Sequence, residues 1–186
     1  YQAWVNRIDT LDKSLRGAAA QLAAAVEPGP GAGQLRISDA AATGLAPILM
    51  SDSPESIEAV LEAIKGGSVT PIVGAATSAT AEAMAKIAKT YKCPLVAKAG
   101  SIQEMADLTA KIKAAGAEDI LLCLDGAGTK EHFYNLARMR VLSLKKAFNP
   151  LGYPVISFVQ GGTADAQAAI AIGLVCKYSN IVVLDT

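Results

Sequence analysis

From residue 46 to the end of the chain, short apolar runs alternate with amphipathic stretches. The runs are rich in Val, Ile and Leu and lie at residues 46–50, 70–75, 94–99, 119–124, 153–159 and 180–185. Apolar residues in these runs do not alternate with polar ones, which is typical of strands buried on both faces of a parallel sheet. We therefore predict six parallel strands.

Between the runs, apolar residues recur three, four and seven positions apart, as on one face of an amphipathic helix. These stripes lie at residues 57–64, 81–88, 105–112 and 136–144. Ser101, with Glu104 three residues later, predicts a capping box at a helix start. Gly116 is suited to the left-handed residue that ends a helix. The last of these helices is expected over residues 129–147.

The resulting order is strand, helix, strand, repeated over residues 46–186. Consecutive parallel strands joined by helices form either a (β/α)₈ barrel or a doubly wound sheet. The units are regular and no dinucleotide-binding fingerprint follows the first strand, so we favour an α/β fold of the TIM-type (β/α) barrel. The chain ends on a strand with no helix after it, so we expect the barrel to be incomplete in this chain.

The beginning of the chain departs from this pattern. Residues 7–27 predict an Ala-rich helix, residues 28–33 ("PGPGAG") a Gly/Pro linker and residues 34–38 a further strand. The linker glycines are interrupted by a proline and do not follow a strand, so they predict a turn rather than a nucleotide loop. We divide the chain into an N-terminal helix and linker, residues 1–42, and a barrel domain, residues 43–186.

Composition removes several classes of protein. With 52% hydrophobic and 18% charged residues, the chain is not a disordered one. Basic and acidic residues both number 17 and aromatic residues make up 5%, which argues against nucleic-acid binding. No apolar stretch is long enough for a bilayer and no signal-peptide pattern is present, so we expect a cytoplasmic protein that does not bind membranes.

The three cysteines, Cys93, Cys123 and Cys176, lie in or beside apolar runs and form no C-x-x-C pair. We interpret them as small hydrophobic residues of a reduced protein, and we expect no metal site in this chain.

In either α/β architecture, ligands bind at the carboxyl ends of the strands. The segments there, among them "LDGAGT" (124–129) and "VQGGT" (159–163), are rich in small residues that let a large planar ligand or another protein approach the backbone. The candidate cofactor-binding residues are Asp125, Gly126, Gly128, Thr129, Gly161 and Gly162. The alternative is a purely structural junction, in which the glycines form the turn and Thr129 caps the next helix.

The other reactive side chains at these ends are Asp52, Lys98 and Gln160. Lys98 has either the position of a Schiff-base lysine or that of a lysine paired with Asp125 or reaching solvent. His132 is expected to be a surface residue in the first turn of a helix, with no nucleophile beside it in the sequence. We therefore predict no catalytic residues and a domain that is not catalytic alone.

A basic cluster follows, made of Arg138, Arg140, Lys145 and Lys146. Arg138 and Lys145 are seven residues apart and so share one helix face, which we interpret as solvated.

The segment "NPLGYPVISF" (149–158), with "RMRVLSLKKAF" before it and "VCKYSNIVVLDT" (175–186) after it, resembles the large (gamma) subunit of the corrinoid iron–sulfur protein. That protein belongs to the acetyl-CoA synthase/CO dehydrogenase system. Earlier segments, including "SIQEMADLTAKIKAAGAEDILL", are similar to the central TIM barrel of the same family, in the same order. The resemblance covers about residues 43–186 and rests on a series of segments rather than on one catalytic motif.

The resemblance implies a methyl carrier, in which a cobalamin takes a methyl group from a methyl-pterin and passes it to acetyl-CoA synthase. It implies a small corrinoid-protein subunit, a pterin-dependent methyltransferase and acetyl-CoA synthase as partners. Cobalamin and a four-iron, four-sulfur cluster would belong to the parent protein, and neither can be assigned to this chain. The barrel would be a scaffold and docking module. Alternatives are a free-standing barrel protein, methyltransferase-like, that binds a pterin or corrinoid, and a structural interaction protein.

Overall fold

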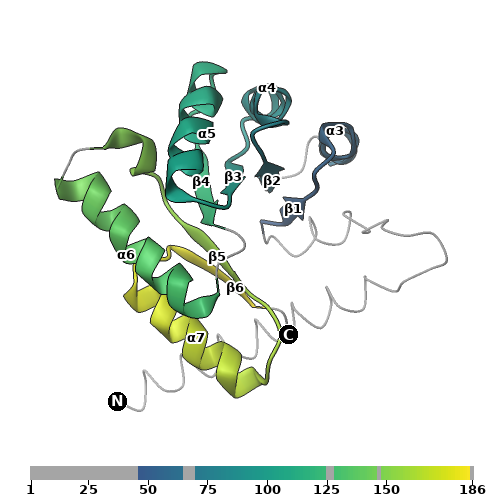
Figure 1. Cartoon of the computed structure of the whole chain (residues 1–186). Coiled ribbons are helices and arrows are strands. Elements are labelled where there is room, and N and C mark those ends of the chain that lie inside the picture. The colour runs from purple at the N-terminus through teal and green to yellow at the C-terminus, as the bar shows by residue number, and fades with distance from the viewer. Residues whose placement is uncertain (1–45, 65–69, 125–127, 146–147, 185–186) are drawn as a thin grey trace, which may run out of the picture. The chain divides into compact units, whose positions relative to one another are not determined.

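The computed structural model of the chain describes residues 46–64, 70–124, 128–145 and 148–184 (Figure 1). The expected N-terminal helix, linker and first additional strand lie outside these residues, and the division at residue 42 stays a prediction. The chain separates into two compact units, residues 1–47 with 60–70 and residues 48–59 with 71–186. The second unit contains every strand of the described residues and is the unit considered below.

The structure confirms six parallel strands at the predicted places. They are β1 (Ile48–Met50), β2 (Ile72–Ala76), β3 (Leu95–Ala99), β4 (Ile120–Leu124), β5 (Ile156–Val159) and β6 (Ile181–Leu184). Strands β1 to β4 form one sheet in sequence order, and β5 pairs with β6. A parallel bridge between Leu122 and Val155 connects the two sheets, and the Leu122 N–H donates to the Pro154 carbonyl at 2.8 Å.

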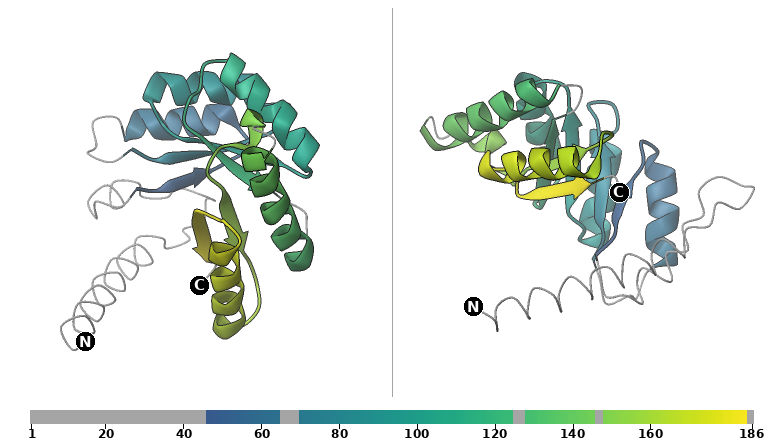
Figure 2. Two further views of the ribbon diagram at one scale, coloured as in Figure 1. Left: turned by 90° about the vertical axis from the view of Figure 1, so that its left-hand side faces the viewer. Right: turned by 90° about the horizontal axis from the view of Figure 1, so that it is seen from below.

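Helices follow the strands in alternation. They are α3 (Pro54–Ala63), α4 (Ala81–Tyr91), α5 (Ile102–Ala114), α6 (Thr129–Lys145) and α7 (Ala164–Cys176), with a short 3₁₀ helix, η1 (Asn149–Leu151), before β5. Figure 2 shows α4 and α5 along one face of the four-stranded sheet, and α7 lies along β5 and β6. This is an α/β fold with the strand order of part of a TIM-type barrel, although closure of a barrel is not seen in the described residues. None of the described helices has the length and apolar character needed to cross a membrane.

Both faces of the sheet are apolar, which explains the unbroken apolar runs in the sequence. Leu121 and Cys123 of β4 belong to a buried cluster with Val96 and Ile156. Successive side chains of a strand point to opposite faces. Leu122, which is fully buried, therefore points away from that cluster to the other face.

Two helix ends confirm the signals seen in the sequence. The side chain of Ser101 accepts a hydrogen bond from the Glu104 N–H at 3.2 Å, and the Glu104 carboxylate accepts one from the Gly100 N–H at 3.1 Å. This is the reciprocal arrangement of a capping box. In the standard motif the Glu carboxylate accepts from the N–H of the N-cap residue, and here it accepts from the N–H of the residue before it, Gly100.

Gly116 ends α5 in a left-handed conformation, with φ +94°. Its N–H donates to the Lys113 carbonyl at 3.0 Å, and the Ala117 N–H donates to the Ile112 carbonyl at 3.3 Å. These two bonds define a Schellman motif, which satisfies carbonyls that the end of the helix would leave without partners.

We predict that Gly116→Ala lowers the free energy of unfolding by about 1 kcal/mol, because a Cβ is disfavoured at this φ. A Cβ there would also lie 2.9 Å from the Lys89 ammonium, which must move aside. Gly100→Ala is the matched control, since its Cβ would meet only the Glu104 carboxylate at 3.7 Å. Urea denaturation of both variants checks this, and equal stabilities would contradict it.

Candidate functional site

A pocket of about 650 Å³ lies where the carboxyl ends of four strands meet the beginning of α6 and the side of α7. The strands contribute Met50 from β1, Lys98 from β3 and Val159 from β5, and Gln160 follows β5. The pocket is therefore at the edge of the fold where ligands bind in parallel α/β proteins.

The structure brings part of the predicted site together. Gly128 and Thr129 line the pocket, while Gly161 and Gly162 directly follow its lining residue Gln160. Both of the latter glycines have positive φ, +70° and +85°, and form the turn before α7. Asp125 and Gly126 lie outside the described residues, so their assignment stays a prediction. Asp52 follows β1 and is exposed, and it is not among the residues that line this pocket.

The predicted capping role of Thr129 is wrong. Helix α6 begins at Thr129, and the N–H of His132 donates to the carbonyl of Gly128 at 2.9 Å. The residue whose carbonyl accepts the first helical bond is the N-cap, so Gly128 holds that position. Glycine is also acceptable at an N-cap, and Thr129 is the first residue of the helix instead. A threonine cap is present at the start of α7, where Thr163 Oγ1 accepts from the Ala166 N–H at 3.3 Å.

His132 is in the first turn of α6, as predicted, but it is half-buried rather than a surface residue. Its Nε2 lies 3.0 Å from the hydroxyl of Ser157 on β5, and Ser157 lies 2.9 Å from the hydroxyl of Ser179. Ser179 in turn lies 3.0 Å from the Ile181 carbonyl. Two buried hydroxyls thus connect the imidazole to the backbone of β6. No local pattern announces these partners, because Ser157 is 25 residues from His132 in the sequence.

The direction of this hydrogen-bond chain is linked to the proton on the imidazole. Ser179 donates to Ser157, so the hydroxyl proton of Ser157 is available for Nε2. When Ser157 donates to Nε2, the neutral ring carries its proton on Nδ1, and when Nε2 carries the proton, Ser157 accepts from it. Ser157 is only 1% exposed, so it cannot attack a ligand, and its role is to position the ring. In the described parts of the chain no carboxylate hydrogen-bonds to the imidazole.

Lys98 is half-buried in the same pocket. Its Schiff-base role and its pairing with Asp125 both stay predictions.

Cys93 and Cys123 are buried, and burial raises the pKa of the Cys93 thiol. Cys176 is exposed at the end of α7, and all three cysteines are free thiols. The described residues contain no group of His, Cys, Asp and Glu side chains that could hold a metal ion.

The fold and the pocket define an α/β domain of parallel strands with a ligand-sized recess at their carboxyl ends. Residues 32–186 match the family described as CO dehydrogenase/acetyl-CoA synthase delta subunit. The chain belongs to this family.

A related protein gives a closer comparison. The corrinoid/iron–sulfur protein large subunit of Moorella thermoacetica is 34% identical over 149 residues, which are 80% of this chain and 33% of the relative. The chain thus spans about a third of the relative's length. The resemblance seen in the sequence is confirmed. A solved phospho-2-dehydro-3-deoxyheptonate aldolase of Thermotoga maritima is 13% identical with a TM-score of 0.41, covering 75% of this chain and 40% of that chain.

We predict that acid destabilises the chain through His132, the one histidine of the sequence. Burial lowers its pKa in the folded state below the ordinary value of 6.5. Between the folded pKa and the unfolded pKa the unfolded chain binds more protons, so stability is lost as the pH falls below about 6.5.

Two measurements check this. The single imidazole gives unambiguous NMR signals, and we expect its midpoint below 6.5. Urea denaturation between about pH 7.5 and pH 5.5, where carboxylates titrate little, should show a falling free energy of unfolding that is absent in His132→Gln. A midpoint at or above the ordinary value would contradict the effect of burial.

Proposed function

We propose that this chain is the barrel domain of a corrinoid iron–sulfur methyl-carrier protein. In this proposal it is a scaffold and docking module for methyl transfer from a methyl-pterin to acetyl-CoA synthase. The observation that carries the proposal is the 34% identity, over 80% of the chain, to a corrinoid/iron–sulfur protein large subunit. The chain spans a third of that relative. In this proposal the other parts of the carrier correspond to the regions of the relative that this chain does not match.

The residues of this chain do not fit the iron–sulfur cluster. Such a cluster takes four cysteine thiolates, and the sequence has three cysteines. Two of them are buried in strands or loops and the third is exposed at the end of α7. We therefore place the cluster outside the part of the protein represented by this chain.

The pocket rim fits one face of a corrinoid better. A Cβ on Gly128 or on Gly161 would meet nothing within 4 Å, so the backbone is open to close approach at both positions. The exposed side chains of Thr129 and Gln160 can hydrogen-bond the amide groups at the edge of a corrin ring. When bound, the corrinoid would supply the cobalt that carries the methyl group. The rim residues would hold and orient the ring, and Asp125, Gly126 and Gly162 belong to the same proposed surface.

The partners in this proposal are the small corrinoid-protein subunit, the pterin-dependent methyltransferase and acetyl-CoA synthase. The competing proposal is a free-standing methyltransferase-like barrel. The strand-end pocket favours it, because a volume of about 650 Å³ is within the range of small-molecule sites. Lys98 and His132 also line this pocket.

Binding measurements on the full chain separate the two. We expect the chain to bind at least one of the three purified partner proteins and to give no spectral change with a methyl-pterin alone. Binding of the methyl-pterin with no affinity for any partner would favour the free-standing protein. Absorbance with methylcobalamin, with and without the small subunit, tests contact with the corrinoid.

We predict that Gly128→Asn weakens binding of methylcobalamin in the presence of the small subunit by about tenfold, because the side chain occupies the approach to the backbone. The melting temperature should stay nearly unchanged, since Asn is a good N-cap and the space around the position is open.

The control is Glu118→Asn, an exposed position in the turn before β4 at the opposite end of the strands. It should alter neither binding nor melting. If Gly128→Asn lowers melting and binding together, or neither of them, the rim does not contact the corrinoid.

A further inference from the structure

We propose that the groove between α5 and α6 is a docking site for an acidic segment of a partner protein, with Arg138 as its charged anchor. The inference rests on the proposed function, because it takes the chain to be one subunit of a larger assembly. It concerns a different surface from the strand-end pocket, and it assigns a role to Arg138, one member of the basic cluster.

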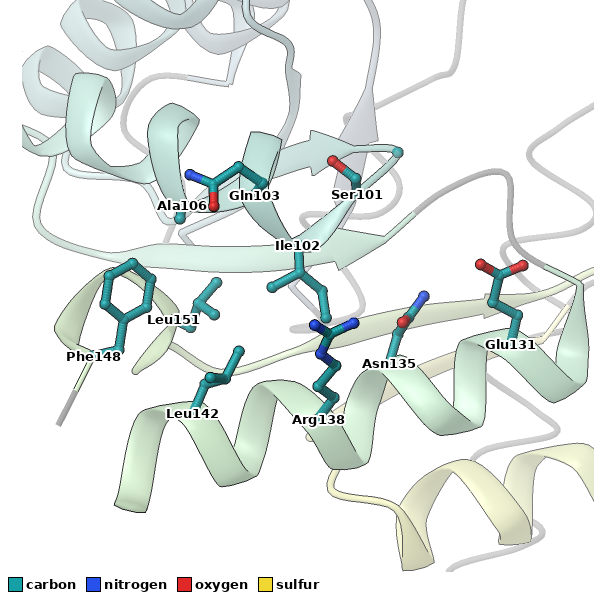
Figure 3. A pocket seen from close by; sticks show the side chains of 11 residues that line it. Ser101, Ile102, Gln103, Ala106, Glu131, Asn135, Arg138, Leu142, Phe148 and Leu151 are labelled. Carbon is teal, nitrogen blue, oxygen red and sulfur yellow. The ribbon is translucent and has the colours of Figure 1, made fainter. Parts of the chain in front are cut away.

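The groove has a volume of about 560 Å³, and its lining changes from apolar at one end to polar at the other (Figure 3). Leu142, Phe148 and Leu151 form an apolar end, while Asn135 and Glu131 lie toward the other end. The guanidinium of Arg138 stands between the two ends and points into the groove near Ile102. A bound segment would therefore meet an apolar recess directly beside a cation.

The walls of the groove are held apart by η1. Helices α5 and α6 each pack against η1 rather than closely against one another. The hydroxyl of Thr109 on α5 lies 2.9 Å from the Pro150 carbonyl and can donate to it, and Leu151 is buried. These contacts fix η1 in place between the two helices. A partner therefore does not have to order η1 when it binds.

The charges of the groove favour a carboxylate at Arg138. Within the described residues Arg138 forms no ion pair, and Lys145 lies two turns further along the same helix face. Glu131, which also lines the groove, is two turns away in the other direction, about 10 Å along the helix axis. Arg140 is directed elsewhere, since its guanidinium lies 5.5 Å from the centre of the Tyr178 ring.

The acidic side chains of α5 already have partners. Glu104 accepts the hydrogen bond from the Gly100 N–H, and Asp107 accepts one from the Gln103 side chain at 3.3 Å. A guanidinium binds a carboxylate through two parallel hydrogen bonds, which gives an incoming Asp or Glu a defined orientation.

A protein segment fits this surface better than a small molecule. Outside the groove lining, α6 exposes further large apolar side chains, such as Tyr134 at 67%, and Phe148 at the groove end is 39% exposed. A ligand confined to the groove would leave these side chains of α6 in water. Arginine and aromatic residues around an apolar recess are the composition of interface hot spots. The expected partner segment has an Asp or Glu next to a large apolar residue.

The test measures the affinity of the full chain for the purified small corrinoid-protein subunit, methyltransferase and acetyl-CoA synthase in turn. We expect Arg138→Glu to weaken binding of one of them at least about tenfold, because it replaces the attraction by repulsion. Arg140→Glu is the matched control, with the same change of charge two residues along the same helix. It should change affinity less than about twofold.

Leu142→Gln tests the apolar end and should weaken binding of the same partner. Circular dichroism and melting curves must show that each variant is folded, and a variant that is not folded is replaced by Arg138→Gln or Leu142→Ala. In addition, p-benzoylphenylalanine in place of Phe148 should crosslink to a peptide of that partner that contains Asp or Glu.

The outcomes are distinct. If the wild-type chain binds a partner and neither Arg138→Glu nor Leu142→Gln weakens it, the groove is not the docking site although the proposed function stands. If Arg138→Glu and Arg140→Glu weaken binding equally, general charge rather than the groove is responsible, and the inference fails. If the wild-type chain binds none of the three proteins, the proposed function and the inference fail together.

Discussion

Burial of the parallel strands on both faces is the constraint on which the rest of this structure depends. On β3 and β4 neither face can be left to water, since Val96 and Leu121 are buried on one side and Leu95 and Leu122 on the other. Helices therefore cover one face of these strands. The side chains of the other face pack into the buried cluster of Val96, Leu121, Cys123 and Ile156. The polar side chains that a ligand or partner could reach lie at the strand ends and on the outer sides of the helices, which is where both the pocket and the groove are found.

The elements that depend on local pattern were predictable from the sequence. The six apolar runs became strands because an unbroken apolar run has no solvent face to offer. Ser101 and Gly116 act as predicted because caps involve residues only a few positions apart. The order of parallel strands followed from the regular alternation. Closure of a barrel could not be predicted from local pattern. It requires pairing between the first and last strands, which are far apart in the sequence.

The site was only partly predictable, for a physical reason. Small residues at strand ends located the pocket rim at Gly128 and Thr129, since the fold class fixes which ends bind ligands. The environment of His132 depends on Ser157 and Ser179, which reach it through strand pairing and not through sequence spacing. Likewise, helix periodicity placed Arg138 and Lys145 on one face, but only the packing of η1 shows that Arg138 has a groove in front of it.

The placement of η1 also has a consequence for the evolution of stability in this domain. By keeping α5 and α6 apart, it sacrifices apolar contact that two neighbouring helices would otherwise make. Larger residues at Ala106 or Asn135 would fill the gap and are the kind of change that selection for stability alone would favour. A chain that keeps the gap open accepts a lower margin of stability, and within a family the size of these two side chains would then indicate which members have retained the groove.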